Sequence, residues 1–235
     1  MLQNISKTQG RIAVPPKEID SKVVSDTFNF NYGTTTLAFV FEEGIIVAAD
    51  SRATQGNLIA NRKTKKVLEI TPHLLGTMAG GAADCAFWER VLTKRAQLYE
   101  LQNNERISAK AASKVLADMV YRFKGRGLVM GTMVCGYDND EPAVYYVEDN
   151  GQRIKGKLFS VGSGSTFAYG VLDTEYRYDM NAEEAIELAR EAIYRAQHRD
   201  AYSGNYINIY HIKPDGWEHV QYTDCTEVMD HYQRD

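Results

Sequence analysis

Three consecutive threonines, Thr34, Thr35 and Thr36, follow Gly33 at the start of an apolar stretch, and Thr34 could act as a nucleophile. Inside a chain, a threonine hydroxyl is a weak nucleophile because no adjacent base accepts its proton. If the bond between Gly33 and Thr34 were cut, Thr34 would carry an α-amino group with a pKa of about 8, which is partly neutral near pH 7. One residue would then supply both nucleophile and base. Taken alone, the same residues also fit the start of a β-strand.

Two charged residues stand at the ends of apolar segments. Asp50 follows a run of five apolar residues, and Lys66 begins the next apolar run. A buried carboxylate is costly unless it is paired. If Asp50 and Lys66 meet beside Thr34, the ammonium would lower the pKa of the Thr34 amine and hydroxyl, and Asp50 would keep Lys66 charged and oriented. An ordinary ion pair at the strand ends is the alternative.

Gly80 and Gly81 fall between a predicted strand and a predicted helix. A glycine lets a backbone N–H group approach a ligand closely, and the start of a helix favours a developing negative charge. These residues therefore indicate a place for the oxyanion of a reaction intermediate. A tight turn between strand and helix explains them equally well.

Two polar loops contain further groups that could take part in chemistry. The segment Gly162–Ser165 precedes a helix but lacks both the GxGxxG pattern and the lysine of a phosphate-binding loop, so it does not indicate nucleotide binding. Asp200 and Ser203 lie in a loop between a helix and a strand. Ser203 and His198 suggest a serine triad, but the GxSxG elbow is absent.

Composition excludes several classes of function. The chain has 235 residues, 44% of them hydrophobic and 25% charged, which is typical of a globular protein. A net charge of −4 argues against nucleic-acid binding through phosphate neutralisation, and no apolar run has the length of a membrane-spanning helix. The cysteines and the five histidines show no ligand spacing, so we expect no metal, and the sparse, odd set of cysteines favours a reducing compartment. The cysteines are Cys85, Cys135 and Cys225.

The chain divides into a polar extension, residues 1–33, and a dense region that follows it. The extension lacks the apolar core of a signal peptide. Apolar patterns predict strands at 37–41, 45–49, 67–70, 74–79, 130–137, 143–148, 158–161, 206–212 and 217–220, and helices over about 85–99, 109–123, 166–176 and 182–197. Ser108 and Asn181 are predicted to cap the second and fourth helices, Asn181 together with Glu184.

Strands that are apolar on both faces need a layer on each side. The order of strands, two helices, strands, two helices and strands is satisfied by two sheets packed face to face with a helix pair outside each. We therefore predict an α+β fold, a four-layer αββα sandwich.

Together, these motifs resemble the proteasome beta subunits, from Thr34 to about Val220. Three stretches point further, to the beta type-5 (chymotrypsin-like) group: Thr34–Phe39 (TTTLAF), Leu75–Cys85 (LGTMAGGAADC) and His198–Gly204 (HRDAYSG). The resemblance implies an N-terminal nucleophile hydrolase of the αββα type and a threonine endopeptidase. It would cleave after large hydrophobic residues in ubiquitin-dependent and other intracellular protein degradation.

The resemblance also implies roles for individual residues. Thr34 would be the nucleophile, and Gly80 would donate its N–H group to the oxyanion. Asp50 and Lys66 would support Thr34, with Arg52 nearby. The outer catalytic network would consist of Ser163, Asp200 and Ser203.

The resemblance assigns a second set of residues to substrate binding. Backbone groups of Thr54, Gly80 and Ala82 would pair with the substrate as an added strand. The pocket for the side chain before the cut would be lined by Ala53, Thr64, Met78, Ala82 and Cys85, whose small size and flexible thioether suit large apolar groups. Thr64 departs from the valine expected there, and its hydroxyl would make the preference less strictly apolar.

The family further implies processing and assembly. Residues 1–33 would be a propeptide that Thr34 removes by attacking the carbonyl of Gly33, leaving a domain of residues 34–235. We expect a seven-membered ring with other beta subunits, contacts with alpha-ring subunits and assembly chaperones, polypeptide substrates, no cofactor, no membrane or nucleic acid, and a location in cytoplasm and nucleus.

Three alternatives differ in their predictions. A non-catalytic structural subunit of the beta ring would have no physical need for Gly33, Thr34, Asp50 and Lys66 together. An amidase acting on a small molecule predicts a compact polar pocket instead of Met78 and alanines. A binding module that never cleaves predicts an uncut Gly33–Thr34 bond.

Overall fold

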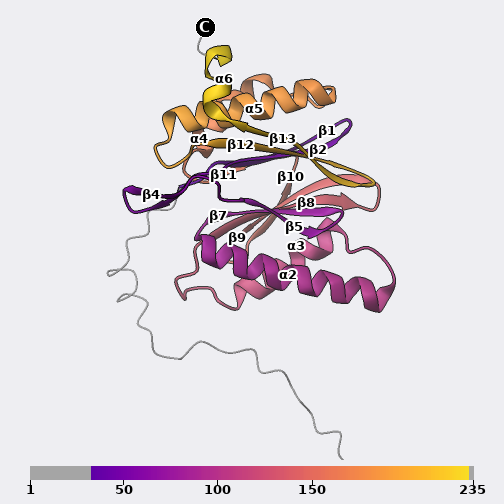
Figure 1. Cartoon of the computed structure of the whole chain (residues 1–235). Coiled ribbons are helices and arrows are strands. Elements are labelled where there is room, and N and C mark those ends of the chain that lie inside the picture. The colour runs from indigo at the N-terminus through magenta and orange to yellow at the C-terminus, as the bar shows by residue number, and fades with distance from the viewer. Residues whose placement is uncertain (1–32, 233–235) are drawn as a thin grey trace, which may run out of the picture.

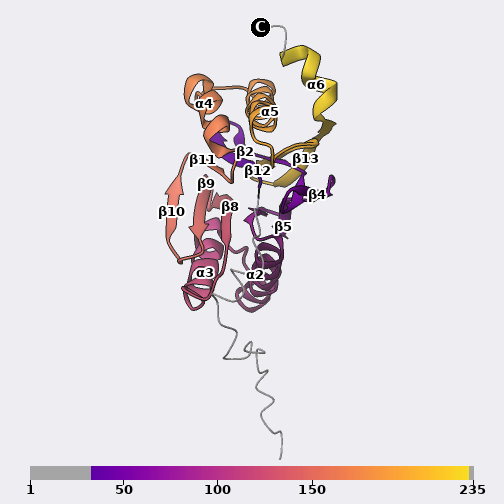
Figure 2. The same cartoon turned by 90° about the vertical axis from the view of Figure 1, so that its left-hand side faces the viewer.

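Two large antiparallel sheets face each other in the part of the chain that the structure describes, and helices cover the outer face of each (Figures 1 and 2). The computed structural model describes residues 33–232. One sheet has the strand order β11-β1-β2-β12-β13, and the other has the order β10-β9-β8-β6-β5, with β7 paired to β8. The predicted αββα sandwich is confirmed.

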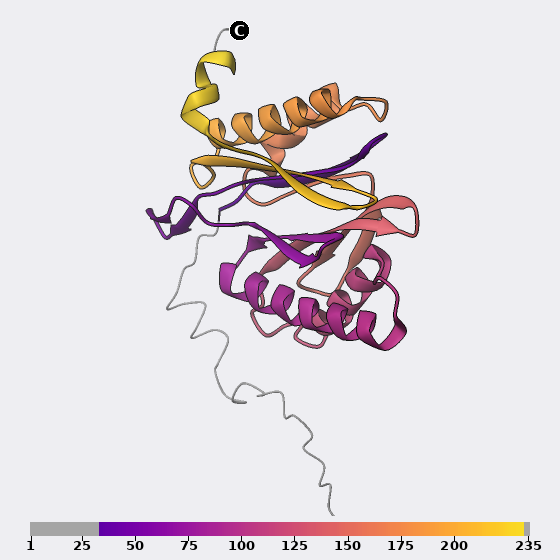
Figure 3. The same cartoon turned by 45° about the vertical axis from the view of Figure 1, so that its right-hand side comes forward.

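The strands of the two sheets and of the small β3-β4 hairpin have these bounds: β1 Thr36–Phe41, β2 Gly44–Asp50, β3 Ala53–Gln55, β4 Leu58–Asn61, β5 Val67–Thr71, β6 Leu74–Thr77, β7 Ala79–Gly80, β8 Met130–Asp138, β9 Glu141–Glu148, β10 Arg153–Gly156, β11 Leu158–Val161, β12 Tyr206–Lys213 and β13 Gly216–Asp224. The helices are α2 Ala82–Asn103, α3 Ala109–Tyr121, α4 Ser165–Glu175, α5 Ala182–Arg199 and α6 Cys225–Tyr232. Helices α4 and α5 lie on one side of the sandwich, and α2 and α3 lie on the other (Figure 3).

The central strands β1 and β2 are buried along their whole length, as their apolar runs predict. Successive side chains of a strand point to opposite faces, so each strand contributes to two clusters. Leu37 and Phe39 pack in the cluster formed with α4 and α5, whereas Ala38 and Val40 pack in the cluster between the sheets. Burial on both faces holds the start of β1 rigidly inside the sandwich.

Two helix starts follow the predicted capping chemistry. The Ser108 hydroxyl accepts a hydrogen bond from the Ala111 N–H at 3.1 Å at the start of α3. At the start of α5, Asn181 accepts from the Glu184 N–H at 2.9 Å, and Glu184 accepts from the Asn181 N–H at 3.0 Å. This reciprocal pair satisfies two N–H groups that the helix itself leaves unpaired.

Several elements were not predicted from the sequence. The hairpin β3-β4 is short and largely exposed, with Leu58 75% exposed, so it shows no alternation of buried and polar positions. Strand β10 and helix α6 were likewise missed, since both are short segments rich in polar residues. The predicted propeptide lies outside the described residues except for Gly33. None of the helices within residues 33–232 combines the length and the apolar character that a membrane span requires.

The cap of α5 gives a test of the fold. Replacing Asn181 by alanine removes the side-chain acceptor at the helix start, and we expect a loss of about 1 kcal/mol in the free energy of unfolding. Asn181→Asp keeps an acceptor oxygen and should retain most of the stability. Denaturant unfolding of the three chains measures both values, and equal stability of Asn181→Ala and the parent chain would contradict the assigned cap.

Candidate active site

Thr34 lies two residues before the start of β1 and is buried, with 6% of its surface exposed. Its backbone N–H donates to the Ser163 hydroxyl at 3.1 Å, and its carbonyl accepts from the Gly164 N–H at 3.2 Å. Gly162 has a φ of +111°, and a Cβ atom there would collide with the Thr34 carbonyl oxygen. The glycine-rich loop therefore serves to approach the Thr34 backbone closely rather than to bind a phosphate.

Asp50 and Lys66 meet beside Thr34 as a buried ion pair. The Lys66 ammonium donates to Asp50 at 2.6 Å, and the two side chains are 3% and 0% exposed. Three backbone N–H groups also donate to the Asp50 carboxylate: those of Thr35 at 2.9 Å, Arg52 at 3.1 Å and Gly204 at 3.0 Å. Because its lone pairs are met by these donors, the carboxylate can remain charged inside the protein.

The electrostatic state of Lys66 depends on two opposing effects. Burial lowers the pKa of the Lys66 ammonium below its usual value, and this is the largest effect. The charge and hydrogen bond of Asp50, and the more distant charge of Asp200, oppose it. A lysine with a lowered pKa beside Thr34 can exchange a proton more readily than a free lysine, while its charge still favours a deprotonated neighbour.

Ser163, Asp200 and Ser203 form a connected network on the other side of Thr34. The Ser163 hydroxyl donates to Asp200 at 2.5 Å, and the Ser203 hydroxyl donates to the same oxygen at 2.6 Å. Because Ser203 uses its proton in this way, the Thr35 hydroxyl donates to Ser203 at 2.7 Å. The structure thus brings the three predicted residues together, and the Thr34 nitrogen is the atom at which the network ends.

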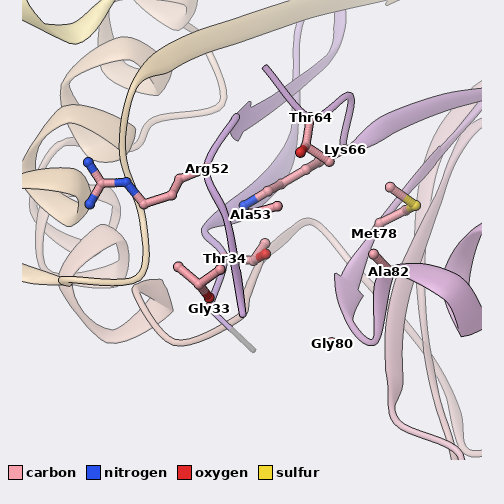
Figure 4. A pocket seen from close by; sticks show the side chains of 10 residues that line it. Gly33, Thr34, Arg52, Ala53, Thr64, Lys66, Met78, Gly80 and Ala82 are labelled. Carbon is pink, nitrogen blue, oxygen red and sulfur yellow. The ribbon is translucent and has the colours of Figure 1, made fainter. Parts of the chain in front are cut away.

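Gly80 lies where β7 meets α2, on the side of the cavity that faces Thr34 (Figure 4). Its φ of +104° is a conformation that other residues rarely adopt, and a Cβ atom there would come 2.8 Å from the Val129 carbonyl oxygen. The N–H group of the next residue, Gly81, donates to that same carbonyl at 2.9 Å. The requirement for glycine at position 80 is therefore structural, and its role as oxyanion donor stays a prediction.

One cavity contains Thr34 together with most of the predicted substrate contacts. Met78, Gly80 and Ala82 face Thr34, Ala53 and Lys66 across it, and the Lys66 side chain extends toward Thr34 (Figure 4). Its full lining is Gly33, Thr34, Arg52, Ala53, Thr54, Thr64, Lys66, Met78, Gly80 and Ala82.

Cys85 is the predicted pocket residue that does not line this cavity. It is fully buried in α2, and its thiol donates to the Ala79 carbonyl at 3.4 Å. Cys85 belongs to the same apolar cluster as Met78, so it lies behind the floor of the pocket. Burial raises the pKa of the Cys85 thiol to about 12, and the charges of Glu89 and Asp84 add to this shift.

Two residues of the site were not predicted from the sequence. Thr35 contributes both its N–H group to Asp50 and its hydroxyl to Ser203, and the threonine triplet was the available signal. Ser51 donates to the Arg62 carbonyl at 2.6 Å and accepts from the Tyr206 N–H at 2.9 Å. Through these hydrogen bonds, Ser51 connects the end of β2 to β12 and to the segment before Lys66. The sequence did not indicate this role, because a serine that follows a buried strand is common.

The described residues hold no group of three or more His, Cys, Asp and Glu side chains that could bind a metal ion. The lining of the cavity includes the Thr34 hydroxyl, the buried Lys66 ammonium and several small residues. If the Thr34 nitrogen were free, it would be an amine held by Ser163 next to its own hydroxyl. Such an arrangement can attack a carbonyl and shuttle one proton.

A four-layer αββα sandwich with this threonine at the start of its first strand defines the N-terminal nucleophile hydrolase class. Comparison with known proteins gives a narrower assignment. The model of the family described as "Proteasome subunit" matches residues 30–212. Proteasome subunit beta type-5 of Dictyostelium discoideum is 55% identical over 93% of this chain and 84% of its own length. The chain belongs to the proteasome subunit family.

Other relatives agree with this assignment. Proteasome subunit beta type-5 of Gallus gallus is 57% identical over 86% of this chain and 78% of its own length. Proteasome subunit beta type-8 of Homo sapiens is 52% identical over 86% of this chain and 73% of its own length. As a member of this family, the chain assembles into the proteasome core with other subunits.

The Asp50–Lys66 pair gives the second prediction. Asp50→Asn leaves the Lys66 ammonium buried without its counter-charge, and we expect a loss of about 3–5 kcal/mol in the free energy of unfolding. The double variant Asp50→Asn with Lys66→Met removes both charges and should be more stable than Asp50→Asn alone. Both should lose about 100-fold or more in peptide hydrolysis. A double variant no more stable than Asp50→Asn would contradict the assigned pair.

Proposed function

We propose that this chain is a catalytic subunit of the proteasome core, a threonine endopeptidase that cleaves after large hydrophobic residues. The observation that carries the proposal is the position of Thr34. Its nitrogen is hydrogen-bonded to the Ser163 hydroxyl, and it lines the same cavity as Lys66. The resemblance to beta type-5 subunits supports the preference for large hydrophobic residues.

The reaction uses the free amine of Thr34 as the base. The Thr34 hydroxyl oxygen attacks the carbonyl carbon of the substrate, and its proton passes to the amine through a water molecule. The Gly80 N–H group stabilises the resulting oxyanion. Collapse of the intermediate breaks the peptide bond, the amine returns the proton to the leaving nitrogen, and a water molecule then hydrolyses the ester.

Lys66 affects these reaction steps through its charge. An ammonium close to the Thr34 hydroxyl lowers the pKa of that hydroxyl and of the amine, so more of the amine is neutral near pH 7. Asp50 orients the lysine and balances its charge. Asp200 holds Ser163, which in turn holds the Thr34 nitrogen. The two carboxylates thus act on Thr34 from two sides and touch no substrate atom.

Activation requires the bond between Gly33 and Thr34 to break. While that bond exists, the Thr34 nitrogen is an amide and cannot act as a base. Gly33 lines the same cavity as Thr34, and a Cβ atom at position 33 would collide with Tyr202. Glycine at position 33 therefore allows its own carbonyl group, which precedes Thr34, to lie within the site. Attack by the Thr34 hydroxyl on that carbonyl would break the peptide bond, free the Thr34 amine and leave residues 1–33 attached to the hydroxyl oxygen as an ester. Hydrolysis of this ester by water would release residues 1–33 as a propeptide and leave residues 34–235 as the active subunit.

Substrate recognition follows from the cavity walls. Ala53 and Ala82 leave space, and Met78 presents a flexible thioether, so the pocket suits a large apolar side chain. The Met78 N–H donates to the Lys66 carbonyl at 2.8 Å, which ties the pocket floor to the segment just before β5 that carries the ammonium. Thr54 on β3 would pair with the substrate backbone as an added strand, a mode that depends little on substrate sequence.

A non-catalytic subunit of the beta ring is the second candidate. The family contains both kinds of subunit, and a purely structural member has no physical need for a buried charge pair next to a threonine that follows glycine. For the assembly, we propose a seven-membered beta ring that stacks on alpha rings and matures with assembly chaperones. We further propose a location in cytoplasm and nucleus.

Removal of the nucleophile gives the third prediction. Particles with Thr34→Ala should lose the hydrolysis of peptides that have a large apolar residue before the cleaved bond, apart from the background of other subunits. Thr34→Ser keeps a hydroxyl and should retain measurable activity. Thr36→Val, two residues further on, is the matched control and should leave hydrolysis within about twofold, since the Thr36 hydroxyl bonds only to a carbonyl of β11 at 3.2 Å in the described structure. Full activity in Thr34→Ala would contradict the proposal.

Thr64 gives the fourth prediction. Its side chain lines the cavity, and its N–H is already fixed by a 2.9 Å bond to the Ser51 carbonyl. Thr64→Val replaces the hydroxyl by a methyl group without moving the backbone, and we expect kcat/KM for a peptide with leucine before the cut to rise about threefold to tenfold. Thr166→Val makes the same change on the exposed part of α4 and serves as the control. A fall in kcat/KM with Thr64→Val would contradict this placement.

A further inference from the structure

Glu89 is a buried carboxyl group for which the proposed reaction has no use. It lies on α2 with 1% of its surface exposed, and within residues 33–232 neither of its carboxyl oxygens has a hydrogen-bond partner. A buried carboxyl is normally paired or hydrogen-bonded, because desolvation without compensation is costly. A buried carboxyl group without a hydrogen-bond partner therefore requires a structural explanation.

The carboxyl group of Glu89 packs directly on the backbone of β6. A Cβ atom built at Gly76 would come 3.1 Å from both the carboxyl carbon and one carboxyl oxygen of Glu89. The same Cβ atom would come 3.2 Å from the side chain of Ile70, which belongs to the apolar cluster between the sheet and α2. Glycine at position 76 thus provides the space in which the carboxyl group lies.

The elements that hold Glu89 also carry the floor of the pocket. Met78 follows Gly76 by two residues, so its side chain points to the same face of the sheet. Cys85 precedes Glu89 by four residues, so the two lie on one face of α2. Met78 and Cys85 pack in the same cluster, and the Cys85 thiol bonds to the Ala79 carbonyl next to Met78. A shift of α2 against β6 at Glu89 would therefore move the pocket floor.

A second unpartnered polar atom lies in the same layer. Strand pairing sets Gly76 opposite Val134 and Ala79 opposite Gly131, which places Thr132 opposite Met78. The Thr132 side chain points to the same face as Val134, toward the cluster with α2. Its hydroxyl is fully buried and, among the described residues, has no partner. The layer behind Met78 therefore contains polar groups, although its other side chains are apolar.

The buried position of Glu89 in the apolar cluster between the sheet and α2 depends on the protonation state of its carboxyl group. Burial raises the pKa of Glu89 well above its usual value, and no charge in the described structure contributes to that shift. The titratable groups that the charge of Glu89 affects are the thiols of Cys85 on α2 and Cys135 on β8, whose pKa values are raised mainly by burial. Since the folded state keeps a proton that the unfolded chain releases, stability falls as pH rises from the usual value through the raised pKa.

We propose that protonated Glu89 is a positioning residue for the specificity pocket, which keeps α2 packed on β6 and so holds Met78 and Cys85 in place for a large apolar side chain. Loss of the proton puts an unpaired charge in the apolar cluster, and the helix turn from Cys85 to Glu89 moves to expose it to water. Large side chains then bind less well, while the chemistry at Thr34 is unchanged. This inference rests on the proposed function.

The test is a ratio measured on assembled particles. The kcat/KM of a peptide with leucine before the cleaved bond is divided by that of the same peptide with alanine, between about pH 6 and about pH 9, the range that buried carboxyls reach. Titration of Thr34 and Lys66 changes both values alike and cancels. We expect the ratio to fall about tenfold with rising pH in the parent chain, through KM rather than kcat.

Variants separate this role from a purely structural one. Glu89→Gln has nearly the shape of the protonated acid and cannot titrate, so its ratio should stay high and independent of pH. Glu69→Gln changes an exposed carboxylate on the neighbouring strand β5 and should keep the fall of the parent chain. A constant ratio in the parent chain, or an equal fall in Glu89→Gln, overturns the inference. Particles with Thr34→Ala give the background, and a parent activity no higher than that background would instead overturn the proposed function.

Discussion

The buried charge pair between Asp50 and Lys66 is the interaction on which the rest of the site depends. Asp50 is fully buried, and its carboxylate gathers donors from four separate segments of the chain. They are the Thr35, Arg52 and Gly204 N–H groups and the Lys66 ammonium. A buried carboxylate must find such donors, because desolvating it without them would cost several kcal/mol. The same requirement fixes the backbone next to Thr34, since Thr35 is one of the donors.

A second constraint acts on Thr34 from the opposite side. Asp200 accepts from Ser163 and Ser203, and these bond in turn to Thr34 and Thr35. The threonine is thus held between two carboxylate-centred networks, both anchored on buried strands and the loop after α5. Rigid support of this kind reduces the reorganisation that a reaction requires. It also explains the glycine-rich loop at Gly162, which must touch the Thr34 backbone.

Much of this arrangement could be predicted from the sequence, for identifiable reasons. Continuous apolar runs gave β1 and β2, and capping residues gave the starts of α3 and α5. Asp50 and Lys66 were conspicuous because each borders an apolar run. Their meeting could not be derived from spacing alone, and neither could the contact of Thr34 with Ser163, which is 129 residues away. Such contacts depend on how the sheets pack.

The features that the sequence did not reveal have separate causes. Hairpin β3-β4 is exposed, so it has no periodic apolar signal. Cys85 was assigned to the pocket, but it is fully buried and packs with Met78 in the apolar cluster under α2 instead of lining the cavity. Glu89 did have a signal, because it falls on the apolar face of α2 between Trp88 and Leu92. The sequence does not reveal that the Glu89 carboxyl group packs on the backbone at Gly76.

The most direct test of the central claim is the N-terminal sequence of this chain, taken from assembled particles and supported by its intact mass. Because Thr34 needs a free amine to act as nucleophile and base, we predict a chain that begins at Thr34 and lacks residues 1–33. A chain in fully assembled particles that still carries the Gly33–Thr34 bond would contradict the catalytic role and leave a structural subunit of the ring.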